Sequence, residues 1–278
     1  MALSRLLAYD LMGREEYEEI GQLIEHDYDV SAYDPRGHFY GGNVYPKLEE
    51  YISPIPLSRI AFAEQELTRF AEENGVCQYV ICGAGMDTFA FRNDNRDIRV
   101  FELDHPDTQR YKTERVKELE WTIKENVRYV AIDFSKDDMV EVLMQAGYDP
   151  SLPSFFSILG VTYYLTLPVF EKTIENIGRI AKPGSRVVFD FPDETTFAGG
   201  GTERVHRLTE ITAKLGEPMQ HGFSTDEITD ALGRHGFGIA IHETPERVQR
   251  HYFASRSDSQ KAYENIHLIE AVKQEDFR

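Results

Sequence analysis

The segment Val80–Arg92 reads VICGAGMDTFAFR, an apolar run that stops at Gly83, Ala84 and Gly85. A Gly-x-Gly pair directly after a strand lets the backbone approach a ligand closely. The full dinucleotide fingerprint needs a third glycine at the position where this chain has Thr88. The segment therefore predicts a strand and a tight turn. That turn could hold a dinucleotide, hold another nucleotide-like cofactor, or only redirect the chain.

Apolar runs and helical patterns alternate after this segment. We expect strands at 78–82, 98–104, 126–134, 154–161, 185–191, 236–244 and 266–273. Such alternation is typical of a parallel sheet with helices on both faces. The segment between the last two strands is polar and has few apolar residues at helical spacing. We therefore expect no crossover helix there, and we expect these two strands to pair antiparallel. The predicted fold is α/β and Rossmann-like, with seven strands rather than the six of a dinucleotide fold.

The helical patterns divide the chain into two parts. Residues 1–74 predict an N-terminal helical cap that ends in a helix over 58–74, with Pro54 and Pro56 breaking the chain before it. Residues 75–278 form the sheet domain, with helices at 106–124 and 167–182 and a lid insertion at about 193–235. Ser135 and Asp138 resemble a capping box ahead of another helix.

The N-terminal part is rich in tyrosine. Its tyrosines are Tyr28, Tyr33, Tyr40 and Tyr45. We expect them either to cover a pocket or to pack the cap on the sheet, and both interpretations stay open. The adjacent pair Gly41-Gly42 would let this segment move as a gate.

Composition limits the classes of function. The formal net charge is −18, which disfavours nucleic acid as a partner, and no Lys/Arg cluster is visible along the chain. Cys77 and Cys82, the two cysteines, form neither a redox pair nor a zinc pattern, so we expect reduced thiols in or beside a buried strand. No metal-ligand spacing, signal peptide or membrane span is apparent, which favours a cytoplasmic protein.

Acidic residues follow the next two predicted strands. FELDHP places Glu102 and Asp104 about 20 residues beyond the glycines, where a carboxylate can hold ribose hydroxyls of NAD or of S-adenosylmethionine. AIDF places Asp133 and Phe134 where they could meet an adenine ring. Each acid alone could equally be a solvated strand end or a cap. Together with the glycines, they face one crevice at the carboxyl edge of the sheet.

The segments ICGAGMDTFAFR, FELDHP, AIDF and SILGVTYYL together resemble the leucine carboxyl methyltransferase family, including bacterial O-methyltransferases of polyketide and other natural-product pathways. The resemblance covers roughly residues 55 to 191. It implies a class I methyltransferase fold with an antiparallel last strand and S-adenosyl-L-methionine as cofactor.

The resemblance also implies roles for particular residues. Gly83, Ala84 and Gly85 would lie against the methionine part of the cofactor, Asp104 would hold the ribose with Glu102 beside it, and Asp133 and Phe134 would meet the adenine. Arg59 matches a family arginine that reaches the cofactor carboxylate, although it could also be a surface residue. Asp87 is expected to cap or brace the loop, with Arg92 as a partner.

One position departs from the family pattern. Many members carry a glutamate at the end of the fourth strand, where this chain has Leu159. This favours the bacterial small-molecule members over the protein-phosphatase enzyme. Candidates for contact with the methyl acceptor are Tyr164, His206 and His221, each of which could instead be structural.

The leading hypothesis is an O-methyltransferase that acts on a small-molecule carboxylate or hydroxyl. The alternatives are an NAD(P)-dependent oxidoreductase and a non-catalytic, cofactor-binding regulatory protein of the same fold. The oligomeric state stays open, with a homodimer as one option.

Overall fold

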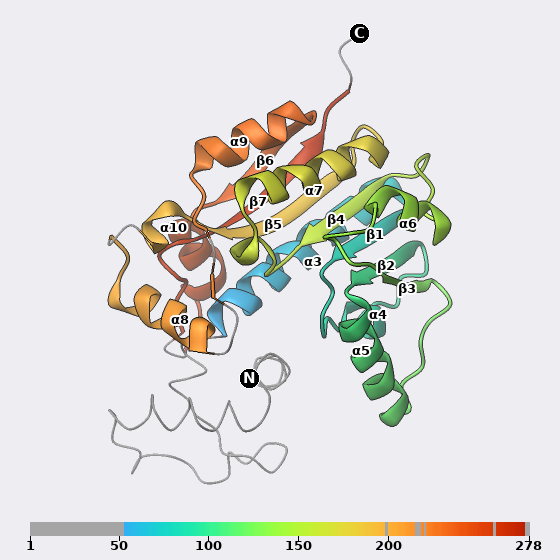
Figure 1. Cartoon of the computed structure of the whole chain (residues 1–278), viewed down its shortest axis with the longest axis horizontal. Helices are drawn as coiled ribbons and strands as arrows, with labels where there is room; N and C mark the ends of the chain where they lie inside the picture. Colours follow the sequence, from blue (N-terminus) through green and yellow to red (C-terminus); the bar gives the residue numbers. More distant parts are fainter. Residues whose placement is uncertain (1–52, 198–199, 215–217, 220, 258–259, 276–278) are drawn as a thin grey trace.

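A computed structural model describes residues 53–197, 200–214, 218–219, 221–257 and 260–275. One twisted sheet runs through this part of the chain, with helices on both of its faces (Figure 1). The predicted N-terminal cap, with its four tyrosines and the Gly41-Gly42 pair, lies outside the described residues. No helix within the described ranges is long and apolar enough to cross a membrane.

The sheet has seven strands in the order β3-β2-β1-β4-β5-β7-β6. Strand β7 runs antiparallel to both of its neighbours, β5 and β6, and the other pairs are parallel. Both features confirm the expected fold class. The strands are β1 Cys77–Cys82, β2 Ile98–Asp104, β3 Val127–Ala131, β4 Ser154–Ile158, β5 Arg186–Pro192, β6 Phe237–Glu243 and β7 Ile266–Lys273.

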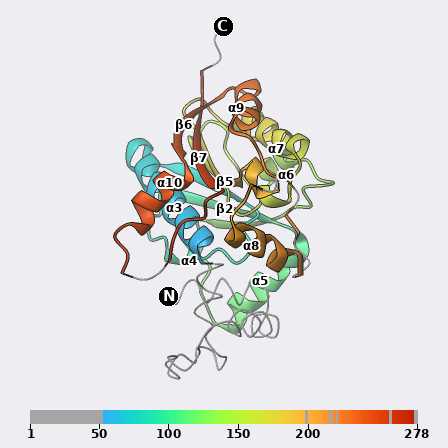
Figure 2. The ribbon, with the colours of Figure 1, turned by 90° about the vertical axis from the view of Figure 1, so that its left-hand side faces the viewer.

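Helices cover the sheet in two layers. They are α3 Pro54–Asn74, α4 Phe89–Arg92, α5 Pro106–Glu118, α6 Met139–Gln145, α7 Leu167–Ile180, α8 Glu203–Lys214, α9 Thr225–Arg234 and α10 Pro245–Val248. Helices α6, α7 and α9 pack into the core on one face, and α3, α4 and α10 pack into the core on the other (Figure 2). The sheet is therefore buried on both faces, and every residue of the central strands β1 and β4 is buried.

The helix before the first strand begins earlier than the sequence predicts. Helix α3 starts at Pro54 and continues through Pro56, so the expectation that these prolines break the chain is wrong. A proline in the first helical turn costs little, because the N–H that it lacks would have no partner inside the helix there.

Two other helix boundaries differ from the prediction. Helix α5 ends at Glu118, not at about 124. Helix α6 is capped by Asp138, whose carboxylate accepts hydrogen bonds from the backbone N–H groups of Val140 and Glu141, and Ser135 takes no part in this cap. A single aspartate satisfies two free donors at a helix start, so no capping box is required.

The segment between β5 and β6 contains two helices with different surroundings. Helix α9 contributes Ile228, Ala231 and Leu232 to the core beside α7. Helix α8 packs in a smaller cluster through Val205 and Leu208. The lid insertion remains a prediction. Since α9 is packed into the core, a lid would have to lie ahead of Ser224, the residue before this helix.

Candidate functional site

The predicted cofactor residues gather at the carboxyl edge of the parallel strands. Gly83 directly follows β1, Asp104 ends β2, Asp133 lies beyond β3, and Gly160 lies just beyond β4. In an open α/β sheet of this kind, ligands bind in the crevice outside this edge.

The glycine turn has a backbone shape that favours glycine. Gly83 has φ +78° and Gly85 has φ +47°, both in the left-handed region. A Cβ on Gly83 would lie 2.6 Å from Val161 Cγ2, whereas a Cβ on Gly85 would meet nothing within 4 Å. The turn is therefore closely packed at Gly83 and open at Gly85.

Asp104 closes this turn from the neighbouring strand. Its Oδ2 accepts a hydrogen bond from the backbone N–H of Gly85, and its Oδ1 accepts one from the N–H of His105 at 2.6 Å. An ionised carboxylate has about four acceptor positions. About half of them stay available for a ligand beside Gly85.

Asp87 braces the loop ahead of the short helix α4, as expected. Its Oδ1 accepts a hydrogen bond from Phe89 N at 2.6 Å. Arg92 does not bond Asp87 but pairs with Glu64 of α3, while its Nε donates to Thr88 Oγ1 at 2.9 Å. The expected partner for Asp87 is thus wrong, since Arg92 points to the neighbouring helix.

A buried ion pair braces the far side of the turn. Lys112 Nζ lies 2.6 Å from Glu102 Oε2 and donates to the backbone carbonyl of Asp87 at 2.7 Å. The side chains of Lys112 and Glu102 are 5% and 1% exposed. Burial raises the pKa of Glu102 to about 7, although Lys112 opposes this shift. Glu102 therefore faces Lys112 inside the protein rather than the open side of the turn.

Asp133 organises the loop after β3. Its carboxylate accepts hydrogen bonds from Ser135 N at 3.0 Å and from Lys136 Nζ at 2.5 Å. The hydrogen bonds from Lys136 and Ser135 hold the pKa of Asp133 well below its usual range. The neighbouring Phe134 is 46% exposed at the same edge. A charged acid and an exposed aromatic ring thus stand side by side beyond β3.

A second buried cluster joins α3, β4 and β5. Arg59 Nη1 lies 3.4 Å from Asp190 Oδ2, which also accepts a hydrogen bond from Tyr163 OH at 2.7 Å. Asp190 Oδ1 accepts one from Gly160 N at 2.7 Å, and a Cβ on Gly160 would lie 2.4 Å from Arg59 Nη1. Burial lowers the pKa of Arg59, but the charge of Asp190, its hydrogen bond and the neighbouring tyrosines together outweigh burial and raise the pKa overall.

Sequence reasoning missed Asp190. The residue is 0% exposed and stands between Phe189 and Phe191 in a strand that is otherwise apolar after Arg186. An acid inside such a run is itself a signal, because a buried charge requires a partner. Asp190 supplies a carboxylate next to Gly160, close to the position where Leu159 replaces the family glutamate.

The three candidates for contact with the acceptor lie in different surroundings. Tyr164 is 39% exposed beside Tyr163, with ring centroids 6.4 Å apart. His206 is exposed on α8. His221 packs edge-on against Phe223, with ring centroids 4.8 Å apart, and within the described residues its buried Nε2 has no hydrogen-bond partner. Tyr164 is linked to the Arg59–Asp190 cluster through Tyr163, whose hydroxyl donates to Asp190.

Metal-binding side chains do not converge in this region. In the described part of the chain, no group of three His, Cys, Asp or Glu residues is placed to hold a metal ion. The free thiols Cys77 and Cys82 are buried at the two ends of β1, as expected.

The strand order, the antiparallel β7 and a glycine turn closed by an acid define a class I methyltransferase of Rossmann-like topology. The sequence profile of the leucine carboxyl methyltransferase family matches residues 8–178. The chain belongs to this family.

Two relatives support the same class. YktD of Bacillus subtilis (strain 168), whose name assigns it to the S-adenosyl-L-methionine-dependent methyltransferases, is 39% identical over 225 residues, covering 80% of this chain and 73% of the relative. Rv0830 of Mycobacterium tuberculosis (strain ATCC 25618 / H37Rv), named in the same way, is 29% identical over 236 residues, covering 78% of each chain. The protein is therefore an S-adenosyl-L-methionine-dependent methyltransferase, and a nicotinamide cofactor is not supported.

Solved structures share the fold. A protein from Thermobifida fusca YX, assigned by name to the methyltransferases, has a TM-score of 0.61 at 15% identity, covering 96% of this chain and 93% of its own. Magnesium protoporphyrin IX methyltransferase from Synechocystis PCC 6803, solved with bound SAH, has a TM-score of 0.52 at 12% identity, covering 94% and 97%.

Proposed function

We propose that this enzyme transfers the methyl group of S-adenosyl-L-methionine to an oxygen atom of a small molecule, either a carboxylate or a hydroxyl. The cofactor site in this proposal consists of Arg59, Gly83, Ala84, Gly85, Asp104, Asp133 and Phe134, with Glu102 acting through Lys112. The junction of Gly85 and Asp104 carries this assignment, because open space adjoins an acid with free acceptor positions.

When bound, the cofactor supplies an electrophilic methyl group on a positively charged sulfur. The chain's part is to bind, orient and exclude water. In this proposal Arg59, fixed by Asp190, presents its remaining N–H donors to the cofactor carboxylate. Asp104 accepts hydrogen bonds from ribose hydroxyls, and the left-handed turn allows the backbone to approach closely.

The surroundings of Tyr163 favour an acceptor that is already ionised. Asp190 already accepts hydrogen bonds from Gly160, Tyr163 and Arg59, so it has little capacity left to accept a substrate proton. Burial and the charge of Asp190 raise the pKa of Tyr163 well above its ordinary value, so this phenol stays protonated. A carboxylate acceptor needs no base at pH 7, whereas a phenol with a pKa near ~10 gains from one.

A methyl-transfer screen tests the proposal. The purified chain is incubated with methyl-labelled cofactor and panels of aromatic carboxylic acids, phenols and peptides with free C-termini. We expect labelled product from a small carboxylic acid or phenol, and mild alkali separates the two classes because it hydrolyses methyl esters but not methyl ethers. Labelling of the peptides alone would contradict the small-molecule assignment.

A further inference from the structure

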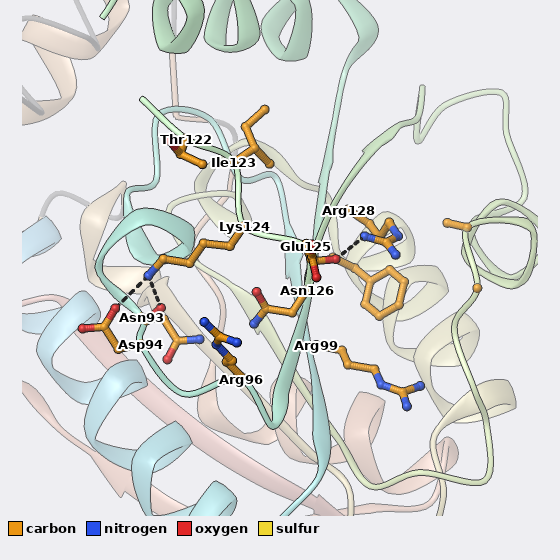
Figure 3. A pocket seen from close by; sticks show the side chains of 13 residues that line it. Asn93, Asp94, Arg96, Arg99, Thr122, Ile123, Lys124, Glu125, Asn126 and Arg128 are labelled. Carbon is orange, nitrogen blue, oxygen red and sulfur yellow. Dashed lines mark hydrogen bonds and ion pairs between the residues drawn. The ribbon is translucent and has the colours of Figure 1, made fainter. Parts of the chain in front are cut away.

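A cavity of about 900 Å³ lies at the amino edge of the sheet, away from the candidate cofactor site. Its lining comes from the start of β2, the start of β3 and the segments before them (Figure 3). Asp104 and Asp133 lie at or beyond the carboxyl ends of the same two strands. The length of β2 therefore separates this cavity from the glycine turn.

Four cationic side chains line the cavity: Arg96, Arg99, Lys124 and Arg128. Two carboxylates, Asp94 and Glu125, also line it. This excess of positive charge occurs on a chain with a formal net charge of −18. No Lys/Arg cluster is visible along the sequence, because the fold brings together basic residues that lie about 30 positions apart.

The strand register places two of the arginines on one face of the sheet. Phe101 of β2 pairs with Arg128 of β3, and Arg99 precedes Phe101 by two residues, so all three side chains share a face. This is the face that carries α6, and the chain just after α6 closes the cavity at Ala146 and Gly147. Arg99 and Arg128 therefore lie on neighbouring strands and on the face of the sheet that also carries Phe101.

These arginines retain unused donors. Within the described residues, Arg128 donates only to the backbone carbonyls of Glu125 and Val127, and Arg96 and Arg99 donate no side-chain hydrogen bond to the protein. Lys124 is already paired with Asp94 at 3.0 Å. Asp149 interacts electrostatically with Arg99, but its Oδ1 accepts hydrogen bonds from the backbone N–H and the hydroxyl of Ser151. Arg96, Arg99 and Arg128 thus carry the free donors.

We propose that this cavity binds a small organic phosphate, with Arg99 and Arg128 holding the phosphate groups. Guanidinium forks match phosphate oxygens in geometry as well as charge. The cavity has the size that small-molecule ligands occupy, and Ile123 and Phe101 provide an apolar wall for the rest of such a ligand. A nucleic acid is disfavoured because the acidic surface beyond the cavity repels a long phosphate backbone.

The single tryptophan gives a direct readout. Trp121 is 47% exposed and immediately precedes the lining residue Thr122. Its fluorescence in the full chain is titrated with inorganic phosphate, pyrophosphate and adenosine 5′-diphosphate, alongside calorimetry. We expect saturable binding of the last two. We also expect it to weaken by about tenfold or more in the double variant Arg99→Gln/Arg128→Gln, which loses two charge-assisted contacts.

A matched variant controls for net charge. Arg110→Gln/Arg115→Gln removes the same charge from the exposed side of α5, where these residues pair with Asp107 and Glu118. Binding within about twofold of wild type in this variant, with S-adenosylhomocysteine affinity unchanged in both variants, supports a separate site. Equal weakening in the two variants, absence of saturation, or tighter binding of a single-stranded oligonucleotide than of the diphosphate overturns the proposal.

Discussion

The guanidinium of Arg59 is fixed by Asp190, with Arg59 Nη1 lying 3.4 Å from Asp190 Oδ2 and the Asp190 side chain fully buried. Gly160 lies directly against the same guanidinium, because a Cβ at this position would come within 2.4 Å of Arg59 Nη1. A glycine after β4 therefore leaves the space that Arg59 occupies. This relationship links the helix before the sheet to the edge at which the cofactor is proposed to bind.

Gly160→Ala is expected to displace Arg59 and weaken cofactor binding. The substitution forces a left-handed residue with φ +71° to carry a Cβ and pushes that Cβ into the guanidinium. Loss of one charge-assisted contact corresponds to roughly 1.5–3 kcal/mol, or about ten- to a hundredfold in affinity for S-adenosylhomocysteine. Isothermal titration calorimetry measures this change.

Gly184→Ala is the matched control for that experiment. Gly184 has φ +86°, but a Cβ there would meet nothing within 4 Å. Both variants share the backbone cost of about 1 kcal/mol in stability, and only Gly160→Ala disturbs Arg59. Equal cofactor affinity in the two variants would exclude a role for Arg59 in binding.

Asp104→Ala is expected to weaken S-adenosylhomocysteine binding by roughly 1–3 kcal/mol, because both the proposed ribose contacts and the hydrogen bond from Gly85 are lost. Asp226→Ala removes an exposed acid from the first turn of α9 and should leave the affinity unchanged. Calorimetry on both variants gives the comparison. Wild-type affinity in Asp104→Ala would mean that Asp104 does not hold the ribose.

The contribution of the buried Glu102 to the stability of the protein should depend on pH. Burial raises the pKa of Glu102 to about 7, so between about pH 4.5 and 7 the folded state binds more protons at this group than the unfolded state. The contribution of Glu102 to stability therefore falls as pH rises through this range. In Glu102→Gln this side chain is neutral at every pH, so the variant does not lose this contribution. The free energy of unfolding of the variant minus that of wild type should therefore rise with pH, by on the order of 3 kcal/mol.

Urea unfolding at pH 5 and pH 7.5 measures this difference. Glu114→Gln, a change at an exposed position of the same helix as Lys112, provides the control and should show no such pH-dependent difference. A pH-independent difference between Glu102→Gln and wild type would show that Glu102 titrates near its ordinary pKa in the folded protein.

The sequence predicts the sheet well, since the central strands are largely apolar and buried, and the turn after β1 carries its own signature. Residues 98–104 and 266–273 match the observed β2 and β7 to the residue. Prediction fails where an interaction joins distant parts of the chain. Asp190 binds Arg59 across 131 positions, and nothing local to β5 identifies that partner.

The basic cavity is a second case of the same limit. Arg99 and Arg128 become neighbours only through the register of β2 and β3, which a single sequence does not specify. Similarly, the charged partner of the buried Glu102 is Lys112, ten residues away on a helix. Local patterns identify elements and turns, whereas pairings between elements require the assembled fold.

The two thiols provide a test of how firmly β1 is held. Burial raises the pKa of Cys77 to about 11 and that of Cys82 to about 12, so at pH 8 only about one Cys77 thiol in a thousand is ionised. Since the thiolate is the reactive form, a disulfide reagent should label neither cysteine in the native protein and both in urea. Rapid labelling of Cys82 without urea would mean that the strand leading into the glycine turn opens in the folded state, and that the turn is not preformed for its ligand.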